Sequence, residues 1–72
     1  MQTSVLIDYK PAYKSAREDN GLTIKDAATM LGVAPATLSR WERGITKPRL
    51  TPLFRMSDIY GVTVSELVGI DA

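Results

Sequence analysis

Residues 23–44 read TIKDAATMLGVAPATLSRWERG, and this stretch decides the fold expected of the chain. Thr23 suits the N-cap of a first short helix, because its side chain can accept a hydrogen bond from a free backbone N–H. Apolar residues then recur at helical spacing as far as Leu31. Gly32 predicts the end of that helix, because glycine enters the left-handed conformation of a helix terminus without steric cost.

A second helix is expected directly after this turn. Pro35 fits its first turn, where the missing N–H costs little. Leu38 and Trp41, three residues apart, provide one buried side. Gly44 predicts the end of the helix, and Pro48 blocks its continuation. The order of helix, glycine turn and helix predicts a helix-turn-helix, the unit whose second helix lies in a DNA major groove.

The rest of the chain predicts three more helices and a short arm. Asp8 is the expected N-cap of the first helix, with Pro11 in its first turn. Thr51 is expected to cap the fourth helix, with Pro52 at its first position, and a Thr-x-x-Glu capping box begins the fifth. Residues 1–8 are expected to form an N-terminal arm, either packed on the body or frayed. The predicted helices, in one domain over 9–69, span 9–20, 23–31, 35–43, 51–60 and 63–69.

Composition argues against catalysis and against a membrane location. The 72 residues suit one small domain, and they include no Cys and no His. The commonest transition-metal ligands and the thiol nucleophile are therefore missing, and no glycine-rich phosphate loop is present, so we expect no enzyme activity and no cofactor. No apolar run is long enough to span a bilayer, and the first residues do not resemble a signal peptide, so we expect a cytoplasmic protein without a membrane partner.

Positive charge is concentrated in one stretch of the chain. The net charge is only +1, but residues 40–55 carry +4, which leaves −3 on the rest. We call these cations the basic band: Arg40, Arg43, Lys47, Arg49 and Arg55. A basic band on an otherwise acidic small protein suits a surface that faces phosphates, and the alternative is a solvated edge.

An ordered set of residues resembles the Cro and lambda-repressor family, also called Xre-type domains. The set comprises Leu22-Thr23, Ala27-Ala28, Leu31-Gly32-Val33, the run from Thr37 to Gly44, and Lys47-Pro48. The resemblance covers residues 9–67. It implies an all-α, five-helix lambda-repressor-like DNA-binding domain, with double-stranded operator DNA as the partner.

The resemblance also implies which residues bind DNA or a partner. The expected DNA- or partner-binding residues are Ile24, Ala34, Pro35, Ala36, Thr37, Arg40, Arg43, Lys47 and Arg49. Arg40 is expected to make a bidentate contact to guanine, and Thr37 to read a base edge or a thymine methyl. Arg43 and Lys47 are expected to neutralise phosphates, and Arg49 to reach a phosphate or the minor groove.

Three further expectations follow from the family. An Arg in the first helix often pairs with a Glu late in the recognition helix, which implies an ion pair between Arg17 and Glu42 rather than a solvated Arg17. Trp41 is expected in the core, with base stacking as the alternative. The last helix often forms a dimer contact, so Val68 and Ile70 suggest a homodimer through the C-terminal helix.

The chain departs from the family where bases are usually read. Many members have Gln at the start of the second helix, and Gln or Ser at the start of the third, whereas this chain has Ile24 and the run from Ala34 to Ala36. Hydrogen-bond readout at that end is therefore poor, and these residues are expected to form a small apolar patch of the kind that marks protein contacts. Two hypotheses remain: a phage-type transcriptional regulator that binds operator DNA, and a modulator that docks on a partner repressor and masks its DNA-binding face in a lysogeny switch.

Overall fold

The computed structural model describes residues 11–69, which are all-helical and contain no strand. The helices are α1 (Tyr13–Asp19), α2 (Ile24–Leu31), α3 (Pro35–Glu42), α4 (Leu50–Tyr60) and α5 (Val64–Val68). This confirms the predicted five-helix all-α fold. Over the described residues, no helix is both long enough and apolar enough to cross a membrane.

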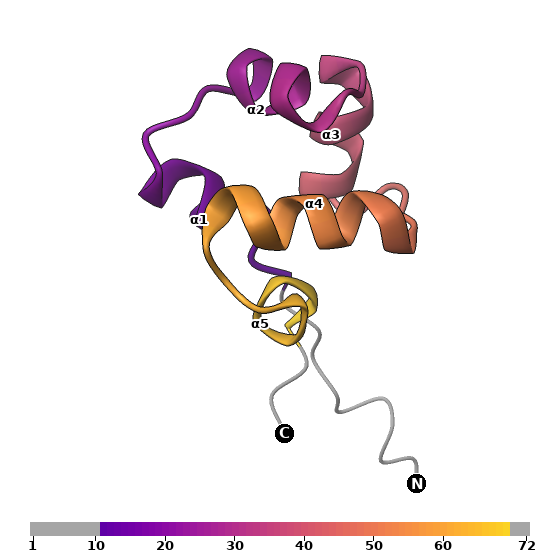
Figure 1. The fold of residues 1–72 in the computed structure, drawn as a ribbon. Helices are drawn as coiled ribbons and strands as arrows, with labels where there is room; N and C mark the ends of the chain where they lie inside the picture. The colour runs from indigo at the N-terminus through magenta and orange to yellow at the C-terminus, as the bar shows by residue number, and fades with distance from the viewer. Residues whose placement is uncertain (1–10, 70–72) are drawn as a thin grey trace, which may run out of the picture.

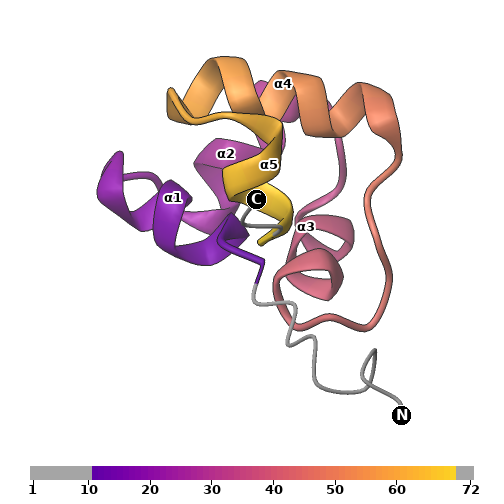
Figure 2. The ribbon, with the colours of Figure 1, turned by 90° about the horizontal axis from the view of Figure 1, so that it is seen from below.

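The helices are arranged around α4. α2 and α3 pack against each other at one end of the molecule, and α4 runs between this pair and α5 (Figure 1). α1 contacts α3, α4 and α5, so it links the two ends. In the view of Figure 2, the connection from α3 to α4 runs along one edge of the molecule, opposite α1. Of the other helices, α2 and α1 make the main contacts with α3.

One hydrophobic core joins all five helices. Its buried apolar side chains are Tyr13, Ala16, Ala27, Ala28, Leu31, Leu38, Trp41, Met56, Tyr60 and Leu67. Leu38, Met56 and Leu67 are the largest that are fully buried, one each from α3, α4 and α5. Trp41 is only 7% exposed, so it belongs to the core as predicted, and its ring is not available to stack on bases.

The first helix begins later than the sequence predicts. Ala12 is the N-cap and Tyr13 the first helical residue, so Pro11 precedes the helix instead of lying in its first turn. The Ala12 N–H donates to the carbonyl of Leu67 at 2.8 Å, so the chain entering α1 is held by α5. The predicted cap Asp8, like the expected arm over 1–8, lies outside the described residues.

The fourth helix begins one residue earlier than predicted, and Thr51 is not its cap. Arg49 is the N-cap, without a side-chain cap hydrogen bond, and Pro52 lies inside the first turn. The first backbone bond runs from the Leu53 N–H to the Arg49 carbonyl at 3.2 Å. The first N–H groups of a helix have no acceptor within it, so a proline is tolerated at any position of that turn. Pro52 therefore predicts where the first turn of the helix lies, but it does not determine which residue is the first in the helix.

Other helix ends follow the local sequence closely. Gly32 ends α2 with a φ of 75°, and the Val33 N–H donates to the Ala28 carbonyl at 3.0 Å. The predicted capping box of α5 is present: the Glu66 N–H donates to the Thr63 hydroxyl at 3.1 Å, and the Thr63 N–H donates to the Glu66 carboxylate at 2.9 Å. That backbone hydrogen bond lowers the pKa of Glu66.

Tyr60 carries a polar atom that the core does not pair. Its side chain is buried, and among the described residues its hydroxyl has no hydrogen-bond partner. Burial raises the pKa of Tyr60, so the hydroxyl stays neutral at ordinary pH. A buried hydroxyl without a partner costs roughly 1–3 kcal/mol relative to one in water.

We therefore expect Tyr60→Phe to stabilise the protein. Removing the unpaired oxygen while keeping the ring should raise the free energy of unfolding by about 1 kcal/mol. Urea denaturation followed by circular dichroism measures this value. Tyr13→Phe is the matched control, because Tyr13 is also buried but borders a surface pocket. A loss of stability in Tyr60→Phe that is absent from Tyr13→Phe would show that the hydroxyl has a partner.

Candidate nucleic-acid interface

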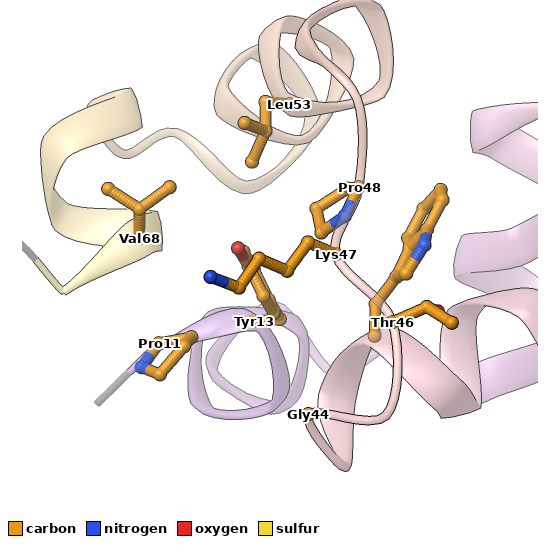
Figure 3. Close-up of a pocket in the computed structure, with 9 residues that line it drawn as sticks. Pro11, Tyr13, Gly44, Thr46, Lys47, Pro48, Leu53 and Val68 are labelled. Carbon is orange, nitrogen blue, oxygen red and sulfur yellow. The ribbon is translucent and has the colours of Figure 1, made fainter. Parts of the chain in front are cut away.

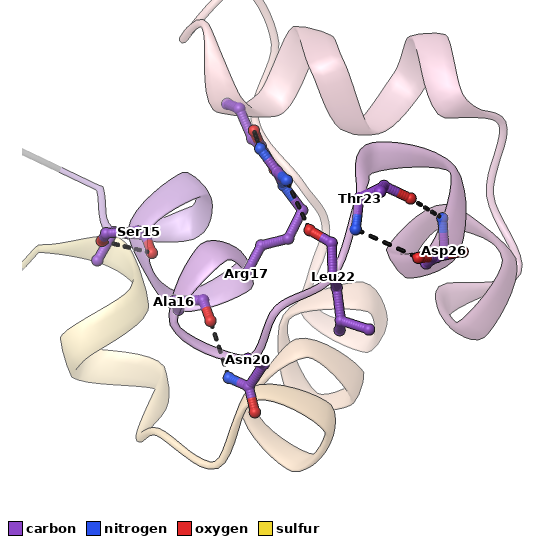
Figure 4. Close-up of polar contacts among 9 residues, drawn as sticks. Ser15, Ala16, Arg17, Asn20, Leu22, Thr23 and Asp26 are labelled. Carbon is purple, nitrogen blue, oxygen red and sulfur yellow. Dashed lines mark hydrogen bonds and ion pairs between the residues drawn. The ribbon is translucent and has the colours of Figure 1, made fainter.

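α2, the glycine turn and α3 form the predicted helix-turn-helix. Thr23 caps α2 through a capping box, in which its hydroxyl accepts from the Asp26 N–H at 3.0 Å and the Asp26 carboxylate accepts from the Thr23 N–H at 3.4 Å (Figure 4). α3 begins at Pro35 after an extended Ala34, which provides no side-chain cap. The turn between them is therefore defined by backbone conformation at Gly32 and Pro35.

An ion pair connects α3 to α1. The guanidinium of Arg17 donates to both carboxylate oxygens of Glu42, at 2.7 and 3.0 Å, and to the carbonyl of Leu22 at 2.8 Å. Figure 4 shows Arg17 reaching from α1 toward Leu22 in the loop before α2. Only 9% of the Arg17 side chain and 6% of the Glu42 side chain are exposed. The hydrogen bond to Glu42 raises the pKa of Arg17, an effect that burial partly opposes. These are the partners that the family resemblance implied.

The side of α3 opposite the core is open. Leu38 and Trp41 are buried, whereas Ala36, Arg40 and Arg43 are exposed. These three exposed residues follow at intervals of four and three, so they lie on one side of the helix. We call them the recognition face.

The first turn of α3 presents little polarity. Ala34, Pro35 and Ala36 are exposed, and we call them the apolar tip. Thr37 is half-buried, so its hydroxyl is less available than the sequence suggested. Ile24 differs from its expected role, because it is half-buried and packs against the core. It was expected to lie on an exposed apolar surface, so the exposed apolar patch is smaller than predicted.

The five cations of the basic band are all exposed, and they differ in what their side chains contact. Arg40, Arg43, Lys47 and Arg49 are exposed. Arg55 is exposed too, but one guanidinium N–H lies 3.5 Å from the carbonyl of Leu31, at the end of α2. A cation at a helix C-terminus interacts favourably with the negative end of the helix dipole. Arg55 therefore stabilises α2.

A pocket of about 400 Å³ lies among α1, α3, α4 and α5. Its walls come from the start of α1, the end of α3, the α3–α4 connection, α4 and α5: Pro11, Tyr13, Trp41, Gly44, Thr46, Lys47, Pro48, Leu53 and Val68. Figure 3 shows the Lys47 side chain extending across this pocket. A phosphate contact by Lys47 therefore requires a different rotamer.

Several exposed apolar side chains were not predicted from the sequence. Leu50 and Phe54 are 62% and 57% exposed on α4, and Ile45 is 59% exposed in the connection before it. The buried apolar side of α4 carries Met56 and Tyr60, with Leu53 packed against the core. Leu50 and Phe54 are four residues apart and lie on a different side of α4, and this spacing is the signal that could have identified a second apolar side.

The expected dimer contact remains a prediction. Val68 is half-buried and lines the pocket. Ile70, the other residue on which the expectation depended, lies outside the described residues.

Comparison with known proteins gives consistent matches. The model of the family HTH_3, described as "Helix-turn-helix", matches residues 14–67. The HTH-type transcriptional regulator ImmR of Bacillus subtilis (strain 168) is 36% identical over 58 residues, which are 81% of this chain and 46% of ImmR. The HTH-type transcriptional regulator DdrOP3 of Deinococcus deserti is 36% identical over 55 residues, 76% of this chain and 43% of DdrOP3. The chain thus spans less than half the length of these relatives. No solved structure matches it significantly.

The ion pair makes a testable contribution to stability. Arg17→Ala leaves the carboxylate of Glu42 buried without its partner, and the expected loss is roughly 3 kcal/mol. The exposed neighbour Lys14 provides the control, because Lys14→Ala should change the free energy of unfolding by less than about 0.5 kcal/mol. Thermal denaturation followed by circular dichroism compares them.

A double variant separates the stranded charge from lost packing. Arg17→Met with Glu42→Leu removes both charges and keeps most of the apolar volume, so it should be more stable than Arg17→Ala. Equal stability of the parent and Arg17→Ala would mean that the pair does not hold α3.

Proposed function

The chain belongs to the HTH_3 helix-turn-helix family, and from that premise we propose that it is a phage-type transcriptional regulator that binds operator DNA. α3 enters the major groove with its N-terminal end toward the base edges. The observation that supports this proposal is the exposure of the recognition face. Leu38 and Trp41 are buried on the other side of α3. The regulatory names of ImmR and DdrOP3 support it.

Each exposed cation has a part in this proposal. Arg40, one turn after Ala36, makes the bidentate contact to guanine. Arg43, at the end of the same face, and Arg49, just before α4, neutralise backbone phosphates. Lys47 joins them after its side chain leaves the pocket. Phosphate contacts give affinity without sequence preference. Sequence-specific binding therefore depends on Arg40.

The second hypothesis is that the protein docks on a partner repressor and masks its DNA-binding face. Its structural support is the apolar tip, which is exposed and lacks side-chain hydrogen-bonding groups. The family and the named relatives do not favour it. Ala36→Glu tests both hypotheses, because a carboxylate repels phosphate in one case and enters a desolvated protein contact in the other. Loss of binding to duplex DNA supports the regulator, and loss of binding to a repressor by a protein that never bound DNA supports the modulator.

Salt dependence is the first measurement. The parent protein should bind a random-sequence duplex, and the logarithm of its association constant should fall linearly with the logarithm of salt concentration. Arg43→Ala should weaken binding to all sequences and reduce that slope by about 0.9 for the lost phosphate contact. Fluorescence anisotropy with a labelled duplex measures both. Lys14→Ala, on α1, is the control. If both variants have the same salt-dependence slope, Arg43 does not contact a phosphate.

Specificity is measured separately through Arg40. Arg40→Ala should cost roughly 1–3 kcal/mol on the preferred duplex and relax the preference at one base pair. On random duplex the loss should be no more than that of Arg43→Ala. If Arg40→Ala and Arg43→Ala lose the same affinity on both duplexes, Arg40 contacts a phosphate and another residue provides the sequence specificity.

A further inference from the structure

The recognition face and the apolar tip share an unusual chemistry. Arg40 and Arg43 have guanidinium groups, which only donate hydrogen bonds. The apolar tip has no polar side-chain atom at all. Glu42 is the only acidic residue of α3, and both of its oxygens accept from Arg17. The exposed side chains of α3 can therefore donate hydrogen bonds or make apolar contacts, and they offer no acceptor.

Two hydroxyls on α3 do not change this conclusion. Thr37 and Ser39 are both half-buried, unlike Ala36 and Arg40. A hydroxyl is the single kind of acceptor left on α3 once Glu42 is paired. Neither Thr37 nor Ser39 is among the exposed residues of α3.

The four bases differ in what they present in the major groove. Guanine presents two acceptors, and thymine presents one acceptor and a methyl group. Adenine presents one acceptor and an amino group that donates, whereas cytosine presents only an amino group that donates. A donor facing a donor leaves both without a partner in a desolvated contact, which is unfavourable. A surface of donors and methyl groups therefore favours guanine and thymine, because it leaves the amino group of adenine or cytosine without an acceptor.

We propose that α3 reads keto bases, with guanine against Arg40 and the methyl group of thymine against Ala36. The inference rests on the proposed function, because it specifies what the recognition face reads in operator DNA. Four residues of helix rise about 6 Å, which is close to two base steps of about 3.4 Å each. The guanine and the thymine therefore lie within about two base pairs of each other.

The first test uses base analogues. A binding sequence is selected from a random-sequence duplex library, and affinity is measured by anisotropy after single replacements in the selected duplex. Deoxyuridine for thymidine removes one methyl group and should lower the affinity about four-fold at one position. 7-Deazaguanine for guanine removes the N7 acceptor and should lower it about five-fold or more at a position within two base pairs. Inosine for guanine is the control, because it alters the minor groove and should have no effect.

The second test changes the protein. Ala36→Gln adds an amide that accepts and donates, the pair of groups that adenine requires. Repeating the selection with this variant should replace thymine by adenine at the position that was sensitive to deoxyuridine. Ala36 is exposed, so the substitution leaves the core intact, and circular dichroism checks that the variant is folded.

The outcomes separate this inference from the proposed function. Sensitivity to both analogues, with the base change in Ala36→Gln, supports the inference. Salt-dependent binding that ignores both analogues overturns it and leaves DNA binding intact. Selection of adenine or cytosine opposite Arg40 overturns it in the same way. If the parent protein binds no duplex at all, the proposed function fails and the inference fails with it, which turns attention to a protein contact at the apolar tip.

Discussion

The guanidinium of Arg17 joins α1 to α3 and to the loop before α2. It donates to both oxygens of Glu42 on α3 and to the carbonyl of Leu22 in the loop before α2. Leu38 and Trp41 bury the neighbouring side of α3. The apolar contacts attach α3 to the core, and the two-point hydrogen bond limits its rotation about its own axis. The position of the recognition face is a consequence of both.

This arrangement contributes more to geometry than to stability. A buried ion pair loses much of its attraction to the cost of removing two charges from water. An apolar pair of the same volume would hold the core as well, but it would lack a directional contact from α1 to α3. The same pairing also changes the surface, because it occupies the one carboxylate of α3. The ion pair between Arg17 and Glu42 therefore leaves the exposed side of α3 with hydrogen-bond donors and methyl groups.

Much of the fold was predictable because its signals are local. The turn at Gly32, the capping of α2 by Thr23 and the capping box of α5 depend on residues within one helical turn of each other. The first residue of α1 was not predictable, because it depends on a hydrogen bond from Ala12 to Leu67 across the molecule. Ile24 was misjudged for a related reason: burial of a first-turn residue depends on what packs beside it, which periodicity does not report.

The amino-acid sequence by itself determined the number of helices, the glycine turn, and the residue types that α3 has available. These follow from backbone conformation and hydrogen bonds between near neighbours, whose energies do not depend on the rest of the molecule. Only the tertiary structure decided which of those residues face outward. The contact between Arg17 and Glu42 closes a separation of 25 residues. The exposure of Leu50 and Phe54, and the pocket shared by α1, α3, α4 and α5, exist only after the helices have packed, because each depends on surfaces from several segments at once.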